Sequence, residues 1–217
     1  MLKATNIHKA YGTLQVLKGI DLEIKKAEIV SIMGASGAGK STLLQIMGTL
    51  DDADLGSVFI NNTDVTQLKS AALARFRNQN IGFIFQFHNL LPEFSALENV
   101  SIPGYLAKRN SKEVEQAATV LLQKLGLAHR INHKPSEMSG GEQQRTAIAR
   151  ALINNPAIIF ADEPTGNLDS KNAIELHELF FQLREELQQT FVIVTHNDEL
   201  AQRADRCLLM KDGNWSE

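Results

Sequence analysis

The sequence is poor in several features that would each indicate a particular class of protein. Cys207 is its single cysteine, so no disulfide can form within the chain. It lies in the apolar run 207–210, and we expect its thiol to be buried in a strand. No run of about 18 apolar residues occurs, so no transmembrane helix is predicted. The first six residues contain no apolar signal-peptide core, and we expect a cytoplasmic protein.

Positive charge is not in excess either. The chain has 22 Lys and Arg against 25 Asp and Glu, a formal net charge of -3. Proteins that bind nucleic acid usually carry a strong basic excess, so we expect no nucleic-acid partner. The length of 217 residues and the hydrophobic fraction of 43% suit one globular domain, or one with a small insert.

Four short apolar runs are typical of strands that are covered on both faces. They are rich in β-branched and aromatic residues and nearly continuous rather than alternating, which predicts a parallel sheet between helices. The runs are 28–33, 81–85, 157–161 and 191–195.

Helical patterns follow or separate these runs. We predict helices over 41–48 and 171–189, and a mostly helical stretch over 87–156. Within that stretch Ser111 is the expected N-cap of a helix that Gly126 ends. Its apolar stripe comprises Val114, Ala117, Ala118, Leu121, Leu122 and Leu125, and that of 171–189 comprises Ile174, Leu176, Leu179, Phe180, Leu183 and Leu187.

The first 26 residues and the segment 57–62 differ from the rest, because they read as short strands joined by hairpin turns. They predict a small antiparallel sheet. The predicted fold is therefore α/β, a mostly parallel sheet flanked by helices with a small antiparallel part. We expect one domain over 1–217, with a core from 1–86 and 157–217 and a helical insert over 87–156.

A glycine-rich loop follows the first apolar run and fits the spacing G-x-x-x-x-G-K-[ST]. Such a loop turns backbone N–H groups toward phosphate oxygens, and the helix that follows points its positive dipole end there. Lys40 would neutralise the β- and γ-phosphates and Ser41 would ligate Mg²⁺, which predicts ATP as the ligand. The loop consists of Gly34, Ala35, Ser36, Gly37, Ala38, Gly39, Lys40, Ser41 and Thr42.

An acidic pair follows the third apolar run. Asp162 and Glu163 would emerge at the carboxyl end of a parallel strand, where ligands bind in open α/β sheets. Asp162 would hold Mg²⁺ through its water shell, and Glu163 would accept a proton from the attacking water. Together with the glycine-rich loop, the pair predicts an enzyme that hydrolyses ATP.

Ser139, Gly140, Gly141 and Glu142 open a further predicted helix. Ser139 and Glu142 have the spacing of a capping box, which alone would explain them. Two glycines in a first turn each cost roughly 1 kcal/mol of helix propensity, however, and bare backbone there suits the close approach of an anion.

With this segment the chain resembles the ATP-binding cassette (ABC) family, whose signature reads L-S-G-G-[EQ]; Met138 stands in place of the leucine. The resemblance covers essentially the whole chain and implies a head-to-tail homodimer, in which Ser139 to Glu142 of one subunit cap the γ-phosphate held by the other. One departure is Ala27, where the family usually has glycine, and it concerns only the turn before the loop strand.

The resemblance also implies roles for residues elsewhere. Tyr11 resembles the aromatic that stacks on adenine, and Gln86 the glutamine that touches Mg²⁺ and the attacking water. Asp169 lies in a segment similar to the loop that crosses the dimer interface. His196 resembles the switch histidine that contacts the γ-phosphate.

The stretch 77–100 resembles the ATPase subunits of bacterial lipoprotein-releasing transporters, which implies a peripheral subunit on the cytoplasmic face of the inner membrane. Related subunits drive macrolide or peptide export or work with a division-site membrane protein, and these remain alternatives. A soluble cassette protein acting on DNA or ribosomes is disfavoured by a single cassette, the lack of a zinc-binding cysteine set and the lack of a long heptad insert.

An apolar cluster next to Gln86 has two interpretations that the sequence leaves open. It could pack inside the helical insert, or it could form a groove for a short cytoplasmic helix of membrane permease subunits. The cluster comprises Phe87, Leu90, Leu91, Pro92 and Phe94.

Overall fold

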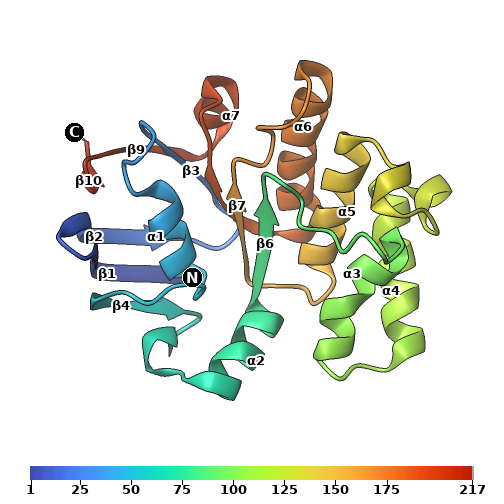
Figure 1. Ribbon diagram of the computed structural model, residues 1–217, viewed down its shortest axis with the longest axis horizontal. Coiled ribbons are helices and arrows are strands. Elements are labelled where there is room, and N and C mark those ends of the chain that lie inside the picture. Colours follow the sequence, from blue (N-terminus) through green and yellow to red (C-terminus); the bar gives the residue numbers. More distant parts are fainter. Residues whose placement is uncertain (217) are drawn as a thin grey trace.

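A mainly parallel six-stranded sheet forms the centre of the computed structural model, which describes residues 1–216 (Figure 1). Every neighbouring pair of its strands is parallel except the last two of the chain, and the predicted α/β fold class is confirmed. Across the sheet the strands lie in the order β10 (Asn214–Trp215), β9 (Arg206–Lys211), β3 (Ile29–Met33), β8 (Thr190–Val194), β7 (Ile158–Asp162) and β6 (Ile81–Phe85).

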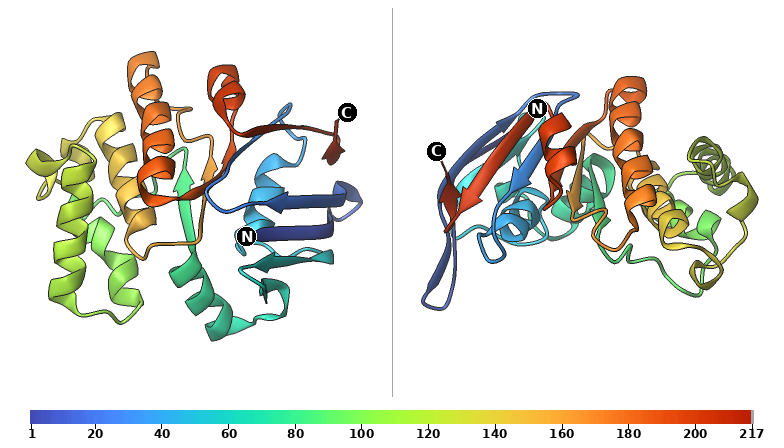
Figure 2. Two further views of the ribbon diagram at one scale, coloured as in Figure 1. Left: turned by 180° about the vertical axis from the view of Figure 1, so that it is seen from behind. Right: turned by 90° about the horizontal axis from the view of Figure 1, so that it is seen from above.

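A smaller antiparallel sheet comes from the segments for which hairpin turns are predicted. It faces the parallel sheet, with one helix and an apolar cluster in between (Figure 1, Figure 2). Its strands lie in the order β2 (Leu14–Ile24), β1 (Leu2–Tyr11), β4 (Leu55–Ile60) and β5 (Thr63–Asp64).

Helices cover the parallel sheet, and three of them pack against one another at the end of the molecule away from the antiparallel sheet (Figure 1, Figure 2). Those three are α3 (Ala96–Leu106), α4 (Ser111–Lys124) and α5 (Gly140–Leu152). The others are α1 (Lys40–Met47), α2 (Ser70–Asn80), α6 (Ser170–Leu187) and α7 (Asp198–Arg203), with short 3-10 turns at Val65–Gln67, Ala128–Arg130 and Pro135–Glu137.

The central strands are apolar throughout because each of their faces packs against its own core cluster. On β7, Phe160 belongs to the cluster between the two sheets, which also holds Leu43 of α1. Its neighbour Ile159 belongs to the cluster on the other face, with Ile148 of α5 and Phe180 of α6. Successive strand side chains point to opposite faces, so a strand buried on both faces cannot alternate in polarity.

Three local expectations were wrong. Asn110, not Ser111, caps α4: its side chain accepts from the backbone N–H of Lys112 and Glu113. Cys207 does lie in a strand, β9, but its side chain is exposed rather than buried. The apolar stripe of α6 was also placed imperfectly, because its first and last members are exposed while His177 is buried. The exposed members are Ile174 and Leu187.

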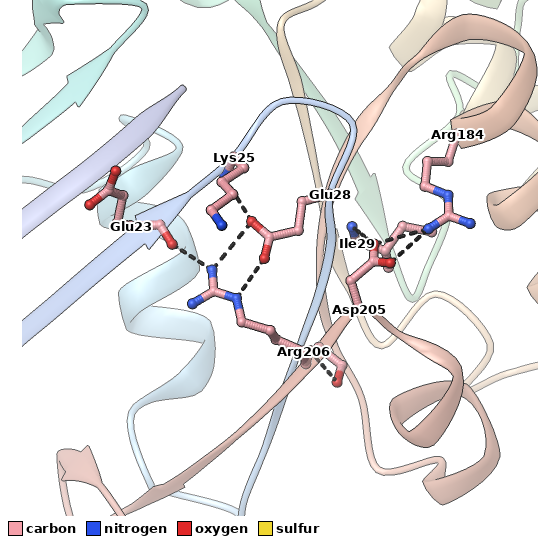
Figure 3. A network of polar contacts seen from close by, with 8 residues as sticks. Glu23, Lys25, Glu28, Ile29, Arg184, Asp205 and Arg206 are labelled. Carbon is pink, nitrogen blue, oxygen red and sulfur yellow. Dashed lines mark hydrogen bonds and ion pairs between the residues drawn. The ribbon is translucent and has the colours of Figure 1, made fainter.

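A network of ionic side chains ties the turn between β2 and β3 to β9 and α6 (Figure 3). The Arg206 guanidinium donates to Glu28 Oε1 at 2.5 Å and to the carbonyl oxygen of Glu23 at 2.5 Å. Asp205 accepts from the backbone N–H of Ile29 at 2.8 Å and from Arg184 at 2.8 Å. These contacts fix where β3 begins, and β3 leads directly into the glycine-rich loop.

Ala27 keeps the turn before β3 although it is not glycine. Its φ of 58° lies in the left-handed region, where a Cβ is unfavourable by about 1–2 kcal/mol. The backbone N–H of Ala27 donates to the Thr190 hydroxyl at 3.0 Å, which helps to hold this conformation.

His177 on α6 is a buried polar residue whose side chain makes no hydrogen bond within the described residues. It is 1% exposed, and neither ring nitrogen has a hydrogen-bond partner within residues 1–216. Burial lowers the pKa of His177, although the charges of Glu199, Arg203 and Glu178 also act on it. The unfolded chain therefore binds a proton at a higher pH than the folded chain, and stability falls as the pH drops through about 6.5.

We expect His177→Leu to raise the free energy of unfolding by about 1–3 kcal/mol at neutral pH, because an unsatisfied buried polar group is removed. The gain should be larger below about pH 6.5, where the native histidine disfavours folding. Urea unfolding at the two pH values measures this. His129→Leu, at an exposed position, is the control that should show no such gain; equal stability of His177→Leu and the native chain at both pH values would contradict the prediction.

Candidate active site

The glycine-rich loop joins the carboxyl end of β3 to α1, as its sequence context predicts. Lys40, the first residue of α1, is buried, and its ammonium donates to the carbonyl oxygens of Gly34 at 2.8 Å and Ala35 at 3.0 Å. The lysine therefore lies across the mouth of the loop. A buried ammonium beside a helix N-terminus makes a strongly anion-attracting site.

Gly39 shows why the loop needs a glycine just before the lysine. Its φ is 104°, and a Cβ there would lie 2.9 Å from the Leu17 side chain and 3.0 Å from the Val16 carbonyl oxygen. A residue with a Cβ would be strained at this φ and would press against β2. The loop can thus curl closely beneath the antiparallel sheet only with glycine at this position.

Asp162 contacts the residue that follows Lys40. It is the last residue of β7, and the Ser41 hydroxyl donates to its Oδ1 at 3.1 Å. Burial raises the pKa of Asp162, while the Ser41 hydrogen bond and the Lys40 charge lower it in part. A hydroxyl and a carboxylate at this distance are both hard oxygen donors, the ligands that Mg²⁺ prefers.

Glu163 and His196 face each other where β7 and β8 end. The backbone N–H of His196 donates to Glu163 Oε2 at 3.2 Å, and the imidazole Nε2 lies 3.3 Å from Oε1. Burial raises the pKa of Glu163, and the nearby His196 opposes this rise. A carboxylate with a raised pKa is a better proton acceptor near neutral pH.

The backbone of Glu163 is held in an unusual conformation. Its φ of 47° is in the left-handed region, and its N–H donates to the carbonyl oxygen of Val194 at 2.9 Å. A non-glycine residue in this region costs of order 1–3 kcal/mol, and such strain is common at functional sites. The turn aims the Glu163 side chain across the strand ends instead of along the strand.

Gln86 joins the site from the end of β6. Its side-chain amide donates to Asn167 Oδ1 at 3.2 Å, and the Asn167 amide donates to the Gln86 carbonyl oxygen at 3.0 Å. This reciprocal pair holds the segment after β6 against the loop that precedes α6. Asp169 ends that loop as the N-cap of α6, where it accepts from the backbone N–H of Asn172 at 2.9 Å.

Ser139 caps α5 in a complete capping box with Glu142. The Ser139 N–H donates to Glu142 Oε2 at 2.7 Å, and Glu142 Oε1 accepts from Arg130 at 2.8 Å. Although burial opposes it, these hydrogen bonds hold the pKa of Glu142 at about 2. Ser139 and Gly140 are exposed at this helix start.

The structure does not bring all of the predicted site residues together in one chain. The loop, Asp162, Glu163, His196 and Gln86 gather where the parallel strands end. The segment 139–142 opens α5, which lies on the other side of β6 and β7 from α1 (Figure 1, Figure 2). Within one chain this segment is therefore remote from the phosphate loop.

Two site-supporting residues have no strong sequence signal. Gln144 is fully buried in α5 and donates to the carbonyl oxygen of Pro164 at 2.7 Å, linking the start of α5 to the Glu163 turn. Asp51, beyond α1, accepts from the Tyr11 hydroxyl at 2.6 Å. The only sequence signal for Gln144 is its place on the apolar side of a helix. The sequence gives no signal for Asp51.

A phosphate loop at a helix start, with a carboxylate pair at the end of a nearby parallel strand, defines a P-loop nucleotide hydrolase. More specifically, the chain belongs to the family described as ABC transporter, which matches residues 17–166. It is an ABC transporter ATPase. Among the residues that the structure describes, no helix is both long and apolar enough to cross a membrane.

Relatives match the chain over nearly its whole length. It is 61% identical over 213 residues to the Lipoprotein-releasing system ATP-binding protein LolD of Bacteroides thetaiotaomicron, covering 98% of each chain. Its identity to the LolD of Cytophaga hutchinsonii is 60%, covering 98% of this chain and 97% of that one. The dimeric post-hydrolysis structure of the ATP-binding cassette MJ0796, bound to ADP and Pi, has a TM-score of 0.91 at 43% identity, covering 100% and 97% of the two chains.

Proposed function

We propose that this chain is the ATP-hydrolysing subunit of a bacterial inner-membrane transporter that releases lipoproteins, bound at the cytoplasmic face. The observation that carries this proposal is the similarity to LolD proteins over nearly the whole of both chains. The site supports the chemistry, because the phosphate loop, Asp162, Glu163 and His196 lie at the carboxyl ends of the parallel strands β3, β7 and β8.

The proposed reaction begins with ATP held by the backbone of residues 34–42 and by Lys40. Mg²⁺, when bound, neutralises phosphate charge. Ser41 and Asp162 would hold it together with Gln86, and the 3.1 Å contact between the Ser41 hydroxyl and Asp162 fits such a donor set. One or two protein oxygens beside substrate phosphates and waters suffice for this ion.

Glu163 accepts the proton of the attacking water in this proposal. His196, which lies against the Glu163 carboxylate, contacts the γ-phosphate and keeps the carboxylate pointed at the water. Tyr11 stacks on the adenine. Gln86 begins the segment that leads from β6 to α3, so a nucleotide contact at Gln86 would also act on the helical insert.

A head-to-tail homodimer completes the site. Ser139, Gly140, Gly141 and Glu142 lie far from the phosphate loop of their own chain, so they can cap a γ-phosphate only in a second copy. The exposed helix start supplies backbone N–H groups for this contact. ATP binding then closes the pair, Asp169 crosses the interface, and hydrolysis reopens it.

The proposed permease contact is the apolar cluster at 87–94. Phe87 is 73% exposed and Leu91 43%, and Phe94 and Pro92 are exposed as well, which favours a docking surface over a core contact. Buried Asn99 fixes the loop beneath them: its amide donates to the carbonyl oxygens of Leu91 and Phe94 and its oxygen accepts from the Leu91 N–H. A rigid loop with exposed apolar side chains loses little entropy on binding.

A cavity of about 440 Å³ adjoins this loop, between α2, β6, α3 and α5. Arg150 closes one of its walls by donating to the carbonyl oxygens of His88 and Asn89. An amphipathic helix of the permease could place one apolar side chain in the cavity and rest against Phe87 and Leu91.

Co-purification tests the proposal. The tagged chain, isolated from membranes in detergent, should bring down an integral membrane permease, and the reconstituted complex should release lipoprotein from vesicles when ATP is added. Phe87→Ala and Leu91→Ala should each lower permease recovery by about tenfold, the usual loss for a buried interface anchor, while basal ATP hydrolysis persists.

Leu187→Ala is the matched control, because Leu187 is 44% exposed but lies on α6, away from the cavity. It should leave permease recovery unchanged. If Phe87→Ala and Leu91→Ala both recover the permease normally, the apolar cluster is not the docking surface. A division-site partner without cargo, or export of a macrolide or peptide, would replace lipoprotein release with one of the alternative functions.

A further inference from the structure

The ring of Tyr11 is held in one orientation by a cluster of charged residues on β1 and beyond α1. The Tyr11 hydroxyl donates to Asp51 Oδ2 at 2.6 Å, and Lys9 donates to the other carboxylate oxygen of Asp51 at 2.9 Å. Lys9 also donates to the carbonyl oxygen of Asp52 at 2.6 Å. Each of these three side chains therefore has a defined position relative to the other two.

The cluster leaves one face of the aromatic ring available. Lys9 is buried, and its ammonium lies over the Tyr11 ring, 5.2 Å from the centroid. The residue Tyr11 is nevertheless 51% exposed, so the ring has a covered side and an open side. An open, fixed aromatic face is a stacking platform for a nucleobase.

Asp51 also connects this platform to the phosphate site. It lies just past α1, where its backbone N–H donates to the carbonyl oxygen of Gln45 at 3.3 Å. A second attachment joins β1 to the same segment, since the N–H of Ala10 donates to Asp54 Oδ2 at 2.6 Å. The helix that begins at Lys40 thus carries at its other end the residue that orients Tyr11.

We propose that Asp51, with Lys9, is a positioning residue for adenine: it fixes the Tyr11 ring at a set distance and angle from the phosphate loop. This inference rests on the proposed stacking of Tyr11 on the base. Preorganisation gains affinity because the ring loses no rotamer freedom when the nucleotide binds, a saving worth about a two- to tenfold change in affinity.

Replacing Asp51 distinguishes an orienting role from a simple effect of charge, because the two predict opposite changes in ATP affinity. Removing a negative charge from a protein that binds an anion should tighten ATP binding, because a repulsion is lost. The orienting role predicts instead that Asp51→Ala weakens ATP binding about two- to tenfold. Asp52→Ala is the matched control: it removes the same charge from the next, exposed position, whose side chain does not contact Tyr11.

Binding of ATP and of inorganic triphosphate to the full chain should be titrated for Asp51→Ala, Tyr11→Phe, the double variant, Asp52→Ala and Tyr11→Ala. We expect Tyr11→Phe to weaken ATP binding as Asp51→Ala does, since it removes only the hydroxyl. The double variant should be no weaker than either single one, because both remove the same interaction. Triphosphate affinity should not fall in any variant, which also shows that the loop remains folded.

The outcomes separate this inference from the proposed function. If Tyr11→Ala leaves ATP affinity unchanged, the stacking of Tyr11 on adenine is wrong and the inference ends with it. If Tyr11→Ala weakens ATP binding by about tenfold or more while Asp51→Ala and Tyr11→Phe bind normally, stacking stands and the orienting role of Asp51 is wrong. Additive losses in the double variant would likewise overturn the coupling between the two side chains.

Discussion

Replacing Glu163 with glutamine is expected to slow ATP hydrolysis by about 10²–10⁴-fold, the usual contribution of a general base. The amide keeps the size of the side chain but cannot accept the proton of the attacking water. ATP binding should persist, because the phosphate loop and Lys40 are untouched. The variant should therefore accumulate an ATP-bound dimer, visible as a doubled mass by size-exclusion chromatography with light scattering.

Glu199→Gln is the control for this change. Glu199 borders the same pocket as Glu163 and His196 but lies on α7, at an exposed position. It should hydrolyse ATP at the native rate and should not form the trapped dimer. If Glu163→Gln hydrolyses ATP at the native rate, Glu163 is not the general base. If hydrolysis is slow but no dimer forms, Glu163 is the base, and the prediction that bound ATP holds two copies together is wrong.

Loss of the Lys40 ammonium is expected to act at an earlier step. Lys40→Ala should weaken ATP binding by about ten- to a hundredfold, since a hydrogen bond to a charged group contributes about 1.5–3 kcal/mol. Lys40 now donates to the Gly34 and Ala35 carbonyl oxygens within the loop, so its ammonium is already beside the phosphate position. Titration with ATP under conditions that prevent turnover measures the effect.

Lys211→Ala serves as the matched control for Lys40→Ala. Lys211 is an exposed lysine on β9, next to the Met210 carbonyl that packs against Gly34. Its replacement removes one positive charge near the loop without touching the proposed phosphate contacts. Unchanged ATP affinity in Lys40→Ala, with thermal unfolding showing a folded protein, would count against the phosphate loop.

The site divides into parts that sequence patterns locate and parts that depend on contacts between distant segments. The glycine-rich loop and the acidic pair each follow a strand in the sequence, so their places at the strand ends were predictable. The closeness of Ser41 to Asp162 was not, because 121 positions separate them and only the strand order brings them together. The same holds for Tyr11 and Asp51, 40 positions apart.

Errors arose where a local pattern had more than one physical solution. Asn110 and Ser111 are both good N-cap residues, and the choice between them depends on which backbone leaves the helical conformation first. Cys207 begins an apolar run, but β9 leaves its side chain exposed. Periodicity identifies a strand or helix, whereas exposure depends on what packs against it.

By itself the sequence determined the class of fold, the order of its segments and the chemistry of the phosphate loop, because these depend on residue type and on short spacings along the chain. The tertiary structure decided which loops meet, how Glu163 is turned toward His196, and that the segment 139–142 lies away from its own phosphate loop. Such relations are set by strand order and by packing between segments that are distant in the sequence, and no local pattern encodes them.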